Sequence, residues 1–224
     1  MVNYSTSEEN YLKAIFHLQQ DEGTVTTNEL AQELNTRPAS VTDMMKKLKT
    51  KKLLHYQPYQ GFRLSTDGNK VALGIIRRHR LWEYFLAEKL KFTWDEVHEV
   101  AEDLEHVRNK KLIDKLDEFL GFPRTDPHGD PIPDANGKLE LTKKICLTDL
   151  SLNTPSLVSS VSDHSSEILE LLEHKKITIG ARLEVKKRFE FDHSMEIRTG
   201  KLPVMTITEQ LAENIFVTPL NTRS

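Results

Sequence analysis

The first 65 residues hold three short segments with a helical spacing of apolar residues, followed by two short segments typical of strands. This order restricts the fold more than any other feature of the chain. In chain order we predict a helix from Ser7 to about Gly23, a helix over 27–34, a helix starting at Pro38, and strands over 53–56 and 62–65. Proline in the first turn of a helix loses no hydrogen bond, and Pro58-Tyr59-Gln60-Gly61 supplies the turn between the strands. Three helices and a hairpin predict a winged helix-turn-helix.

The rest of the chain divides into a helical middle and a β-rich end. We predict helices over 66–90, 93–107 and 110–119, a loop over 123–137, a helix over 165–174, and strands over 182–191 and 195–198. The predicted fold is therefore mainly α with a small β domain. We expect an N-terminal winged helix-turn-helix DNA-binding domain (1–72), a helical dimerisation and metal-binding domain (73–140), and a C-terminal SH3-like β-barrel domain (141–224).

Charge is unevenly distributed along the chain, although the formal net charge is only −3. Residues 1–80 carry 12 Lys or Arg against 8 Asp or Glu, residues 81–140 carry 8 against 15, and residues 141–224 carry 11 against 11. A basic front suits a module that contacts phosphates, whereas clustered carboxylates repel one another unless a cation neutralises them. Composition alone leaves a solvated helix face as the other interpretation of the acidic segment.

Cysteine usage and hydropathy restrict the setting of the protein. The single cysteine, Cys146, excludes a disulfide within the chain and a cysteine-rich zinc site. The first residues show no basic and apolar leader, and no stretch reaches the roughly 18 apolar residues of a membrane span. We therefore expect a cytoplasmic protein without a membrane partner.

Two polar side chains interrupt the apolar face of the predicted helix over 66–90. His79 and Glu83 are one turn apart, on the same side as Ile75, Leu86 and Leu90. Burying an imidazole and a carboxylate is costly unless something pairs with both. The two side chains can pair with each other at this spacing, and taken alone that is the simpler interpretation.

The next predicted helix carries four further candidate ligands on one stripe. They are His98, Glu102, Glu105 and His106, which border an apolar face. Imidazole together with carboxylate suits borderline divalent ions, and the lack of thiolates disfavours copper(I) and structural zinc. A solvated Glu and His face is the alternative, but two helices with the same ligand types favour a metal site.

The third predicted helix and the wing present side chains suited to a DNA groove. The candidate DNA contacts are Arg37, Ala39, Ser40, Thr42, Asp43, Lys46, Lys47 and, on the wing, Arg63. Small side chains permit a close approach to base edges in the major groove, and basic ones contact phosphates or bases. A winged helix used for protein contacts is the alternative, which the lysine cluster over 46–52 disfavours.

Together these residues resemble the metal-dependent transcriptional regulators of the diphtheria toxin repressor and manganese transport regulator type (DtxR/MntR). The likeness covers nearly the whole chain. Besides the helix-turn-helix and wing, it rests on Glu9-Asn10-Tyr11-Leu12, Arg78-His79-Arg80-Leu81 with Glu83, His98 through Glu102 to Leu104-Glu105-His106-Val107, and Asp126-Pro127-His128-Gly129-Asp130-Pro131-Ile132-Pro133. Each segment alone is weakly specific, whereas their joint spacing is specific.

The resemblance implies two metal sites per subunit. One would use Glu102, Glu105 and His106 with Asn10 from the first helix. The other would use His79, Glu83 and His98. It would be completed by the proline-rich loop or the C-terminal domain, for which the candidates are Asp126, His128, Asp163, His164 and Glu167.

The resemblance also implies the cofactor and the partners. The expected cofactor is Mn²⁺ or Fe²⁺, with other divalent transition metals able to substitute in vitro. Glu102 gives a hard donor set that favours manganese, whereas His98 and the C-terminal domain are typical of the iron-responsive branch. The expected partners are double-stranded operator DNA and a second copy of the chain in a homodimer, and the expected role is repression of manganese or iron uptake genes.

Two other functions fit part of the sequence. A winged-helix regulator without metal would use His79 and Glu83 only as a buried pair. A metal-dependent hydrolase would need an open substrate cleft, and the sequence has no phosphate-binding glycine loop, nucleophile elbow or His-Glu-x-x-His motif. We therefore expect no enzymatic activity.

Overall fold

The computed structural model describes residues 4–57, 61–94, 96–140, 144–162 and 165–220, which form two compact units. The first unit consists of Met1–His79, Glu102–Phe119 and Pro133–Leu139. The second consists of Arg80–Ala101, Leu120–Ile132 and Glu140–Ser224. The boundary passes through one long helix, which therefore supplies residues to both units. The division into three domains at residues 72 and 140 stays a prediction.

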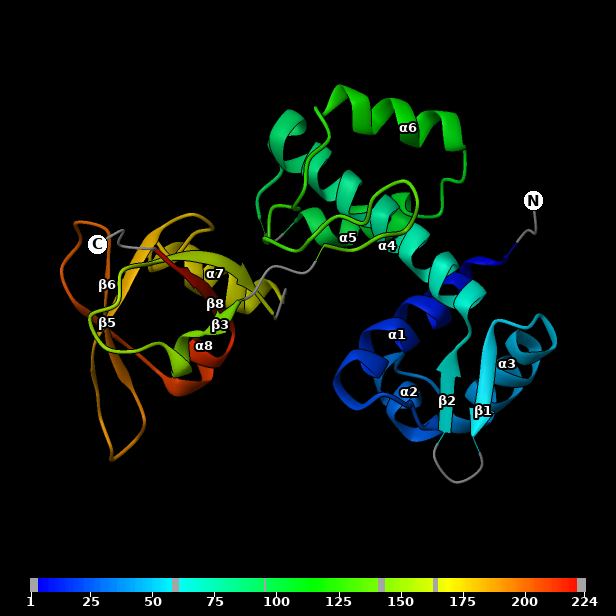
Figure 1. Cartoon of the computed structure of the whole chain (residues 1–224), viewed down its shortest axis with the longest axis horizontal. Helices are drawn as coiled ribbons and strands as arrows, with labels where there is room; N and C mark the ends of the chain where they lie inside the picture. The colour runs from blue at the N-terminus through cyan, green and yellow to red at the C-terminus, as the bar shows by residue number, and fades with distance from the viewer. Residues whose placement is uncertain (1–3, 58–60, 95, 141–143, 163–164, 221–224) are drawn as a thin grey trace. The chain divides into compact units, whose positions relative to one another are not determined.

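The first unit begins with the predicted three helices and hairpin (Figure 1). These elements are α1 (Thr6–Glu22), α2 (Thr27–Glu33), α3 (Pro38–Thr50) and the antiparallel strands β1 (Leu54–Gln57) and β2 (Gly61–Leu64). Helix α1 starts before the predicted Ser7, because Ser5 caps it. The Ser5 hydroxyl accepts a hydrogen bond from the Glu8 amide, and the Glu8 carboxylate accepts one from the Ser5 amide. Residues 58–60, the predicted turn of the wing, lie outside the described residues.

One hydrophobic core holds these elements together. The inward face of α3 consists of Val41, Met45 and Leu48, which are buried. They pack in one cluster with Leu12 and Ile15 of α1. Burying such side chains stabilises the fold by about 1.5–3 kcal/mol each, so α3 presents its outer face from a rigid support.

Three helical elements follow the hairpin in the chain. Helix α4 (Thr66–Phe85) runs directly into a π-helical turn, η1 (Leu86–Leu90), and α5 (Val97–Leu104) and α6 (Lys110–Phe119) come next. Helix α6 has its predicted bounds. The helix predicted over 93–107 is shorter than expected: the Thr93 amide bonds to the Glu96 side chain before α5, and at the other end the Val107 amide bonds to Leu104 O in a tight turn.

The C-terminal part of the second unit is a six-stranded antiparallel sheet with strand order β3-β8-β4-β5-β6-β7. Its elements are β3 (Ile145–Cys146), η2 (Leu147–Asp149), β4 (Ser156–Val161), α7 (Ser166–His174), β5 (Arg182–Arg188), β6 (Met195–Thr199), β7 (Met205–Ile207), α8 (Glu209–Glu213) and β8 (Ile215–Pro219). The predicted helix and both predicted strands of this region are present. Strand β5 ends before the predicted residue 191, because the Phe189 amide already turns back to Ser194 O.

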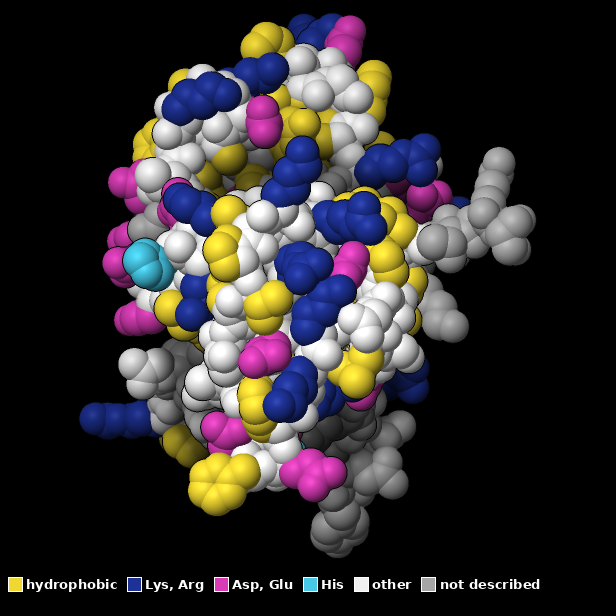
Figure 2. Space-filling model, turned by 90° about the vertical axis from the view of Figure 1, so that its left-hand side faces the viewer, with side chains coloured by type: hydrophobic (Ala, Val, Ile, Leu, Met, Phe, Trp, Pro, Cys, Tyr) yellow, Lys and Arg dark blue, Asp and Glu magenta, His cyan; other side chains and the backbone are white. Residues whose placement is uncertain are grey.

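Charge on the surface is mixed in the view of Figure 2. Basic, acidic and hydrophobic side chains alternate over that face. Within the residues that the structure describes, no helix is both long and apolar enough to cross a membrane.

Candidate metal centre

A buried carboxylate, Glu105, is the centre of the first cluster, which lies wholly in the first unit. It follows the end of α5, and its side chain is 0% exposed. Its Oε2 lies 2.7 Å from His79 Nδ1 on α4 and accepts a hydrogen bond of 2.8 Å from Lys13 Nζ on α1. Lys13 Nζ also donates to Glu102 Oε1 at 2.5 Å. Burial would raise the pKa of the Glu105 carboxyl, but the His79 ring and the Lys13 ammonium together hold it below its ordinary value.

Glu9 of α1 is a second buried carboxylate in this cluster, and the sequence analysis missed it. Its Oε2 lies 2.7 Å from His106 Nδ1, and its Oε1 pairs with Arg78 at 3.2 Å and with Arg108 at 3.1 Å. Acidic residues are common in the first turn of a helix because of the helix dipole, which hides such a role in the sequence. The predicted ligand Asn10 is half-buried, and its Oδ1 accepts no hydrogen bond among the described residues.

The donor atoms of this first cluster fit a divalent ion. His79, Glu102 and Glu105 each offer one atom, and these atoms lie within 4.8 Å of one another. The second oxygen of Glu105, Oε1, is buried, accepts no hydrogen bond among the described residues, and lies 3.7 Å from His106 Nε2. Leaving a carboxylate oxygen buried without a donor is unfavourable, and a cation bound there would remove that cost.

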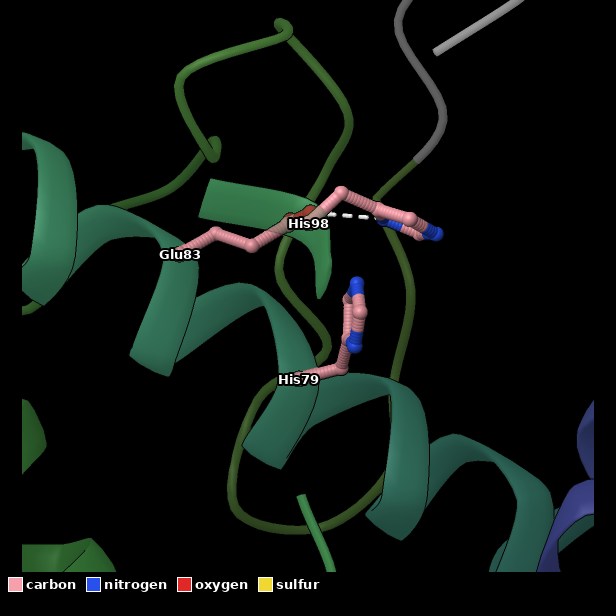
Figure 3. A group of neighbouring side chains, drawn as sticks. All are labelled: His79, Glu83 and His98. Atoms are coloured by element: carbon pink, nitrogen blue, oxygen red, sulfur yellow. Dashed lines mark hydrogen bonds and ion pairs between the residues drawn. The ribbon is translucent and has the colours of Figure 1, made fainter. Parts of the chain in front are cut away.

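The second cluster lies in the second unit around Glu83, whose side chain is 1% exposed on α4. Its Oε1 is 3.1 Å from His98 Nδ1 on α5 and 3.8 Å from His128 Nδ1 on the loop before residue 132. Glu83, Asp126 and His128 each offer an atom within 4.8 Å of the others. Figure 3 shows the ion pair between Glu83 and His98, with His79 one turn before Glu83 on the same helix.

The loop over 126–130 places Asp126 and His128 by local hydrogen bonds. Asp126 Oδ1 accepts bonds from the amides of His128 at 2.8 Å and of Asp130 at 2.9 Å. The His128 ring stacks on Trp94, with ring centroids 5.6 Å apart, and its Nε2 lies 3.1 Å from Trp94 O. Because a carbonyl only accepts, Nε2 must carry the proton, which leaves the lone pair of neutral His128 on Nδ1, on the side of Glu83.

Asp126 lacks sufficient compensation for a buried charge. Burial raises its pKa well above the ordinary value, the carboxylates of Glu83 and Asp130 raise it further, and Arg80 only partly opposes them. The Arg80 Nε lies 3.4 Å from Asp126 Oδ2. A proton or a metal ion would neutralise this group, and imidazole with two carboxylates is a donor set that borderline divalent metals accept.

Glu167, a further predicted ligand, is not brought to these clusters. Glu167 is exposed on α7 and belongs to none of the groups of neighbouring ligand atoms found among the described residues. Asp163 and His164 lie outside the described residues. Their role as ligands, like that of Asn10, stays a prediction.

The predicted DNA-contacting residues are exposed. Arg37 directly precedes α3, and Arg63 lies on β2. All of the predicted contacts have exposed side chains, namely Arg37, Ala39, Ser40, Thr42, Asp43, Lys46, Lys47 and Arg63. A surface of this kind leaves α3 free to approach a duplex, with Lys46 held near Asp43 by an exposed pair at 3.2 Å.

Helix α1 is tied to α3 by a buried acid, Glu8, whose side chain is 2% exposed. Its Oε1 lies 2.6 Å from Lys51 Nζ and 3.2 Å from Lys47 Nζ. Burial would raise the pKa of Glu8, but hydrogen bonds from Lys51, the Ser5 amide and Lys47 lower it to about 2. Helix α1 therefore contacts the metal cluster through Glu9 and Lys13 and the predicted recognition helix through Glu8.

We expect Glu8 to make folding stability depend on pH in acid. Since its pKa is lowered from 4.5 to about 2 in the folded protein, the ionised form stabilises the fold above pH 4.5, and this stabilisation is lost as the pH falls toward 2. Glu8→Gln should lose about 1–2 kcal/mol at neutral pH and flatten this acid dependence. Urea unfolding between pH 6 and pH 3 measures how the free energy of unfolding changes with pH, with the exposed Glu33→Gln as the control variant. An equal change with pH in wild type and Glu8→Gln would contradict this prediction.

The sequence matches three protein families along its length. Residues 3–62 match the family described as iron dependent repressor, N-terminal DNA binding domain. Residues 65–134 match the iron dependent repressor, metal binding and dimerisation domain, and residues 145–219 match the FeoA domain.

Individual relatives agree with these matches. The iron-dependent repressor IdeR of Mycobacterium leprae is 28% identical over 182 residues, which cover 76% of this chain and 78% of that protein. The regulator MntR of Oceanobacillus iheyensis is 30% identical over 120 residues, 54% of this chain and 81% of that protein. A solved manganese-dependent transcriptional repressor in complex with manganese has a TM-score of 0.87 and 31% identity, covering 95% of this chain and 100% of its own.

These matches confirm the main expectations from the sequence. The fold combines helical DNA-binding and dimerisation domains with a C-terminal FeoA domain of the SH3-like type. The function is that of a DNA-binding, divalent-metal-binding, dimerising repressor and not of an enzyme, so the hydrolase and the metal-independent regulator are excluded. The chain therefore belongs to the DtxR/IdeR/MntR family of metal-dependent repressors that regulate iron and manganese homeostasis.

Proposed function

We propose that Mn²⁺ bound at two sites per chain activates this repressor for operator binding. The first site uses Glu102, Glu105 and His106, with Asn10 as a further oxygen donor. The second uses Glu83, His98, Asp126 and His128. His79 lies on α4, the helix that also carries Glu83. The observation that carries the proposal is Glu105, a fully buried carboxylate with one oxygen that accepts no hydrogen bond and faces His106.

Manganese is proposed because every donor is an oxygen or an imidazole nitrogen. Carboxylate, amide and imidazole donors suit Mn²⁺, whereas a thiolate would favour softer ions. The single cysteine, Cys146, pairs with backbone carbonyls of Ala212 and Glu213, away from both donor sets in the sequence. Fe²⁺ is the second candidate, since its donor preferences overlap.

Helix α1 supplies the proposed route from metal to DNA. An ion on Glu105 and His106 would fix His106, which contacts Glu9, and Glu9 and Glu8 are adjacent on α1. Glu8 in turn holds Lys47 and Lys51 of α3. A metal that binds more tightly when these contacts are formed than when they are broken would thus favour the orientation of α3 that fits DNA.

The proposed DNA-binding form is a dimer that presents two α3 helices to successive major grooves. Groove spacing in B-DNA requires recognition elements about 34 Å apart, so a small rotation of α3 matters. Helix α6 offers exposed apolar side chains, Leu112 and Phe119, for the twofold contact. We propose that the regulator acts in the cytoplasm, where the chromosome lies, and represses genes for manganese or iron uptake.

Removal of metal should weaken operator binding by about 10–100-fold, the usual range of allosteric coupling. The operator can be selected from a random double-stranded DNA library in the presence of Mn²⁺. Anisotropy titrations of the selected DNA against chelated protein, and against protein with Mn²⁺, Fe²⁺ or Zn²⁺, then measure the coupling. Equal affinity with chelator and with every metal would overturn metal activation.

A further inference from the structure

A pocket of about 460 Å³ lies in the first unit and shares one residue, Glu9, with the first cluster. Four parts of the chain form its wall: the start of the chain with α1, the middle of α4, the segment 108–114 and Ala135. Pockets that hold small molecules have volumes of about 300–1,000 Å³, so this one is large enough for a small organic ligand.

Positive charge predominates in the wall of this pocket, which we call the basic pocket. Its basic side chains are Lys70, Arg77, Arg78, Arg108 and Lys110. Two carboxylates, Glu9 and Asp114, also line it. Lys110 forms an exposed pair with Asp114, and such pairs contribute little to stability. Lys70 is exposed, and its ammonium forms no ion pair among the described residues. The wall therefore attracts an anion and offers it an ammonium that has no carboxylate to give up.

Apolar side chains line the rest of the basic pocket, among them Tyr4, Val71 and Ile113. Gly74 lies between them in the middle of α4, where glycine lowers helix stability relative to alanine. Packing does not require this glycine, because a Cβ there would meet only Arg78 Nη1, at 3.9 Å. Its effect is to leave the pocket open beside an apolar wall.

Two of the basic side chains connect the pocket to the first cluster. Arg78 and Arg108 line the pocket and pair with Glu9 Oε1 at 3.2 Å and 3.1 Å. The other oxygen, Glu9 Oε2, lies 2.7 Å from His106 Nδ1. A ligand that contacts α1, α4 and the segment 108–114 together would favour the arrangement in which Glu9 reaches His106. Linkage then requires that such a ligand and a metal on His106 strengthen each other's binding.

We propose that the basic pocket binds a small organic anion and that this ligand strengthens Mn²⁺ binding at the first cluster. The acidic group, a carboxylate or a phosphate, lies near Lys70, and the apolar body lies against Val71, Gly74 and Ile113. The pocket itself does not depend on the proposed metal sites, whereas the coupling rests on the proposed function. The repressor would thereby respond to a metabolite as well as to a metal.

The test of the pocket uses the chelated full chain and two fluorescent probes. One is 8-anilinonaphthalene-1-sulfonate, and the other is N-phenyl-1-naphthylamine, which has the same apolar body without the sulfonate. Fluorescence titration should show tighter binding of the sulfonate. Phenylacetate and phenyl phosphate, added as competitors, then distinguish a carboxylate from a phosphate, with benzyl alcohol as the neutral control.

Two variants of α4 separate the contributions of shape and charge. Gly74→Leu fills the pocket and should weaken both probes by about tenfold or more, whereas Gly74→Ala adds one methyl group and should retain them. Lys70→Gln should weaken only the sulfonate, by about threefold. Its control is Lys111→Gln, because Lys111 is exposed on α6 and does not line the pocket.

Equal affinity of the sulfonate for wild type, Gly74→Leu and Lys70→Gln would overturn the pocket, as would displacement by benzyl alcohol as effective as by the anions. Lys70→Gln is a surface change, so it decides the question even if Gly74→Leu does not fold. For the coupling, Mn²⁺ affinity of wild type should rise about fivefold or more with saturating sulfonate. Unchanged Mn²⁺ affinity would overturn the coupling alone. If wild type binds no Mn²⁺, the proposed metal sites are wrong, and the probe titrations still decide the pocket.

Discussion

Operator binding by Glu105→Ala is expected to show no response to Mn²⁺, leaving the variant at the affinity of chelated wild type. Glu105 contacts Lys13 and His79 through one oxygen and presents the other to His106. Its removal deletes the carboxylate on which the proposed first site is centred. Mutation of residues that only hydrogen-bond to a metal ligand already lowers metal affinity by about 10–100-fold. We therefore expect removal of Glu105 itself to lower the Mn²⁺ affinity of this site by roughly 100-fold or more.

The control for this experiment is Glu99→Ala, because Glu99 is an exposed carboxylate on the same helix, α5. It should keep the full Mn²⁺ response. Circular dichroism on all three proteins checks that they fold, and titration of the selected operator with and without Mn²⁺ measures the response. A Glu105→Ala variant that still tightens on DNA with Mn²⁺ as wild type does would refute the assignment of Glu105.

The elements that could be predicted from sequence are those with strong local signals. Helix α3 has a regular apolar stripe with proline in its first turn, and α6 has its periodic pattern followed by Gly121 with a positive φ of 77°. Helix α5 was predicted too long at both ends. Its last predicted turn is replaced by the tight turn that buries Glu105, and burial against other elements is not a local property of the sequence.

The candidate metal site was predictable as a set of residue types but not as a set of contacts. Helical spacing placed His79 and Glu83 on one face, and the structure brings each of them beside a second carboxylate or histidine. Glu9 was not predicted as a member, since it stands on a helix whose apolar residues alone explain its pattern. Which tautomer His128 adopts depends on a carbonyl 34 residues away, and no sequence pattern records that contact.

Gly129→Ala is expected to displace the loop that carries Asp126 and His128 from its contact with strand β4. Gly129 has a φ of +83°, and a Cβ there would lie 1.9 Å from Ser159 O, where β4 carries a bulge between Val158 and Ser160. That backbone conformation costs alanine about 1–2 kcal/mol. The clash between the alanine Cβ and the Ser159 carbonyl oxygen cannot be relieved by a rotamer change, because both atoms are fixed by the backbone. We expect a total of about 3 kcal/mol or more, which for a chain of this length lowers the Tm by roughly 6–12 °C.

Gly121→Ala separates the two contributions, because Gly121 also has a positive φ, +77°, but a Cβ there would meet nothing within 4 Å. It should show only the backbone strain, about 1–2 kcal/mol. Since Asp126 and His128 depend on the loop, Gly129→Ala should also lose Mn²⁺ at the second site while Gly121→Ala retains it. Calorimetric Tm values and Mn²⁺ stoichiometry test both effects. If the two variants lose equal stability and both keep full stoichiometry, the close approach of Gly129 to Ser159 does not position the ligands, and the second site would have to be held by α4 and α5 alone.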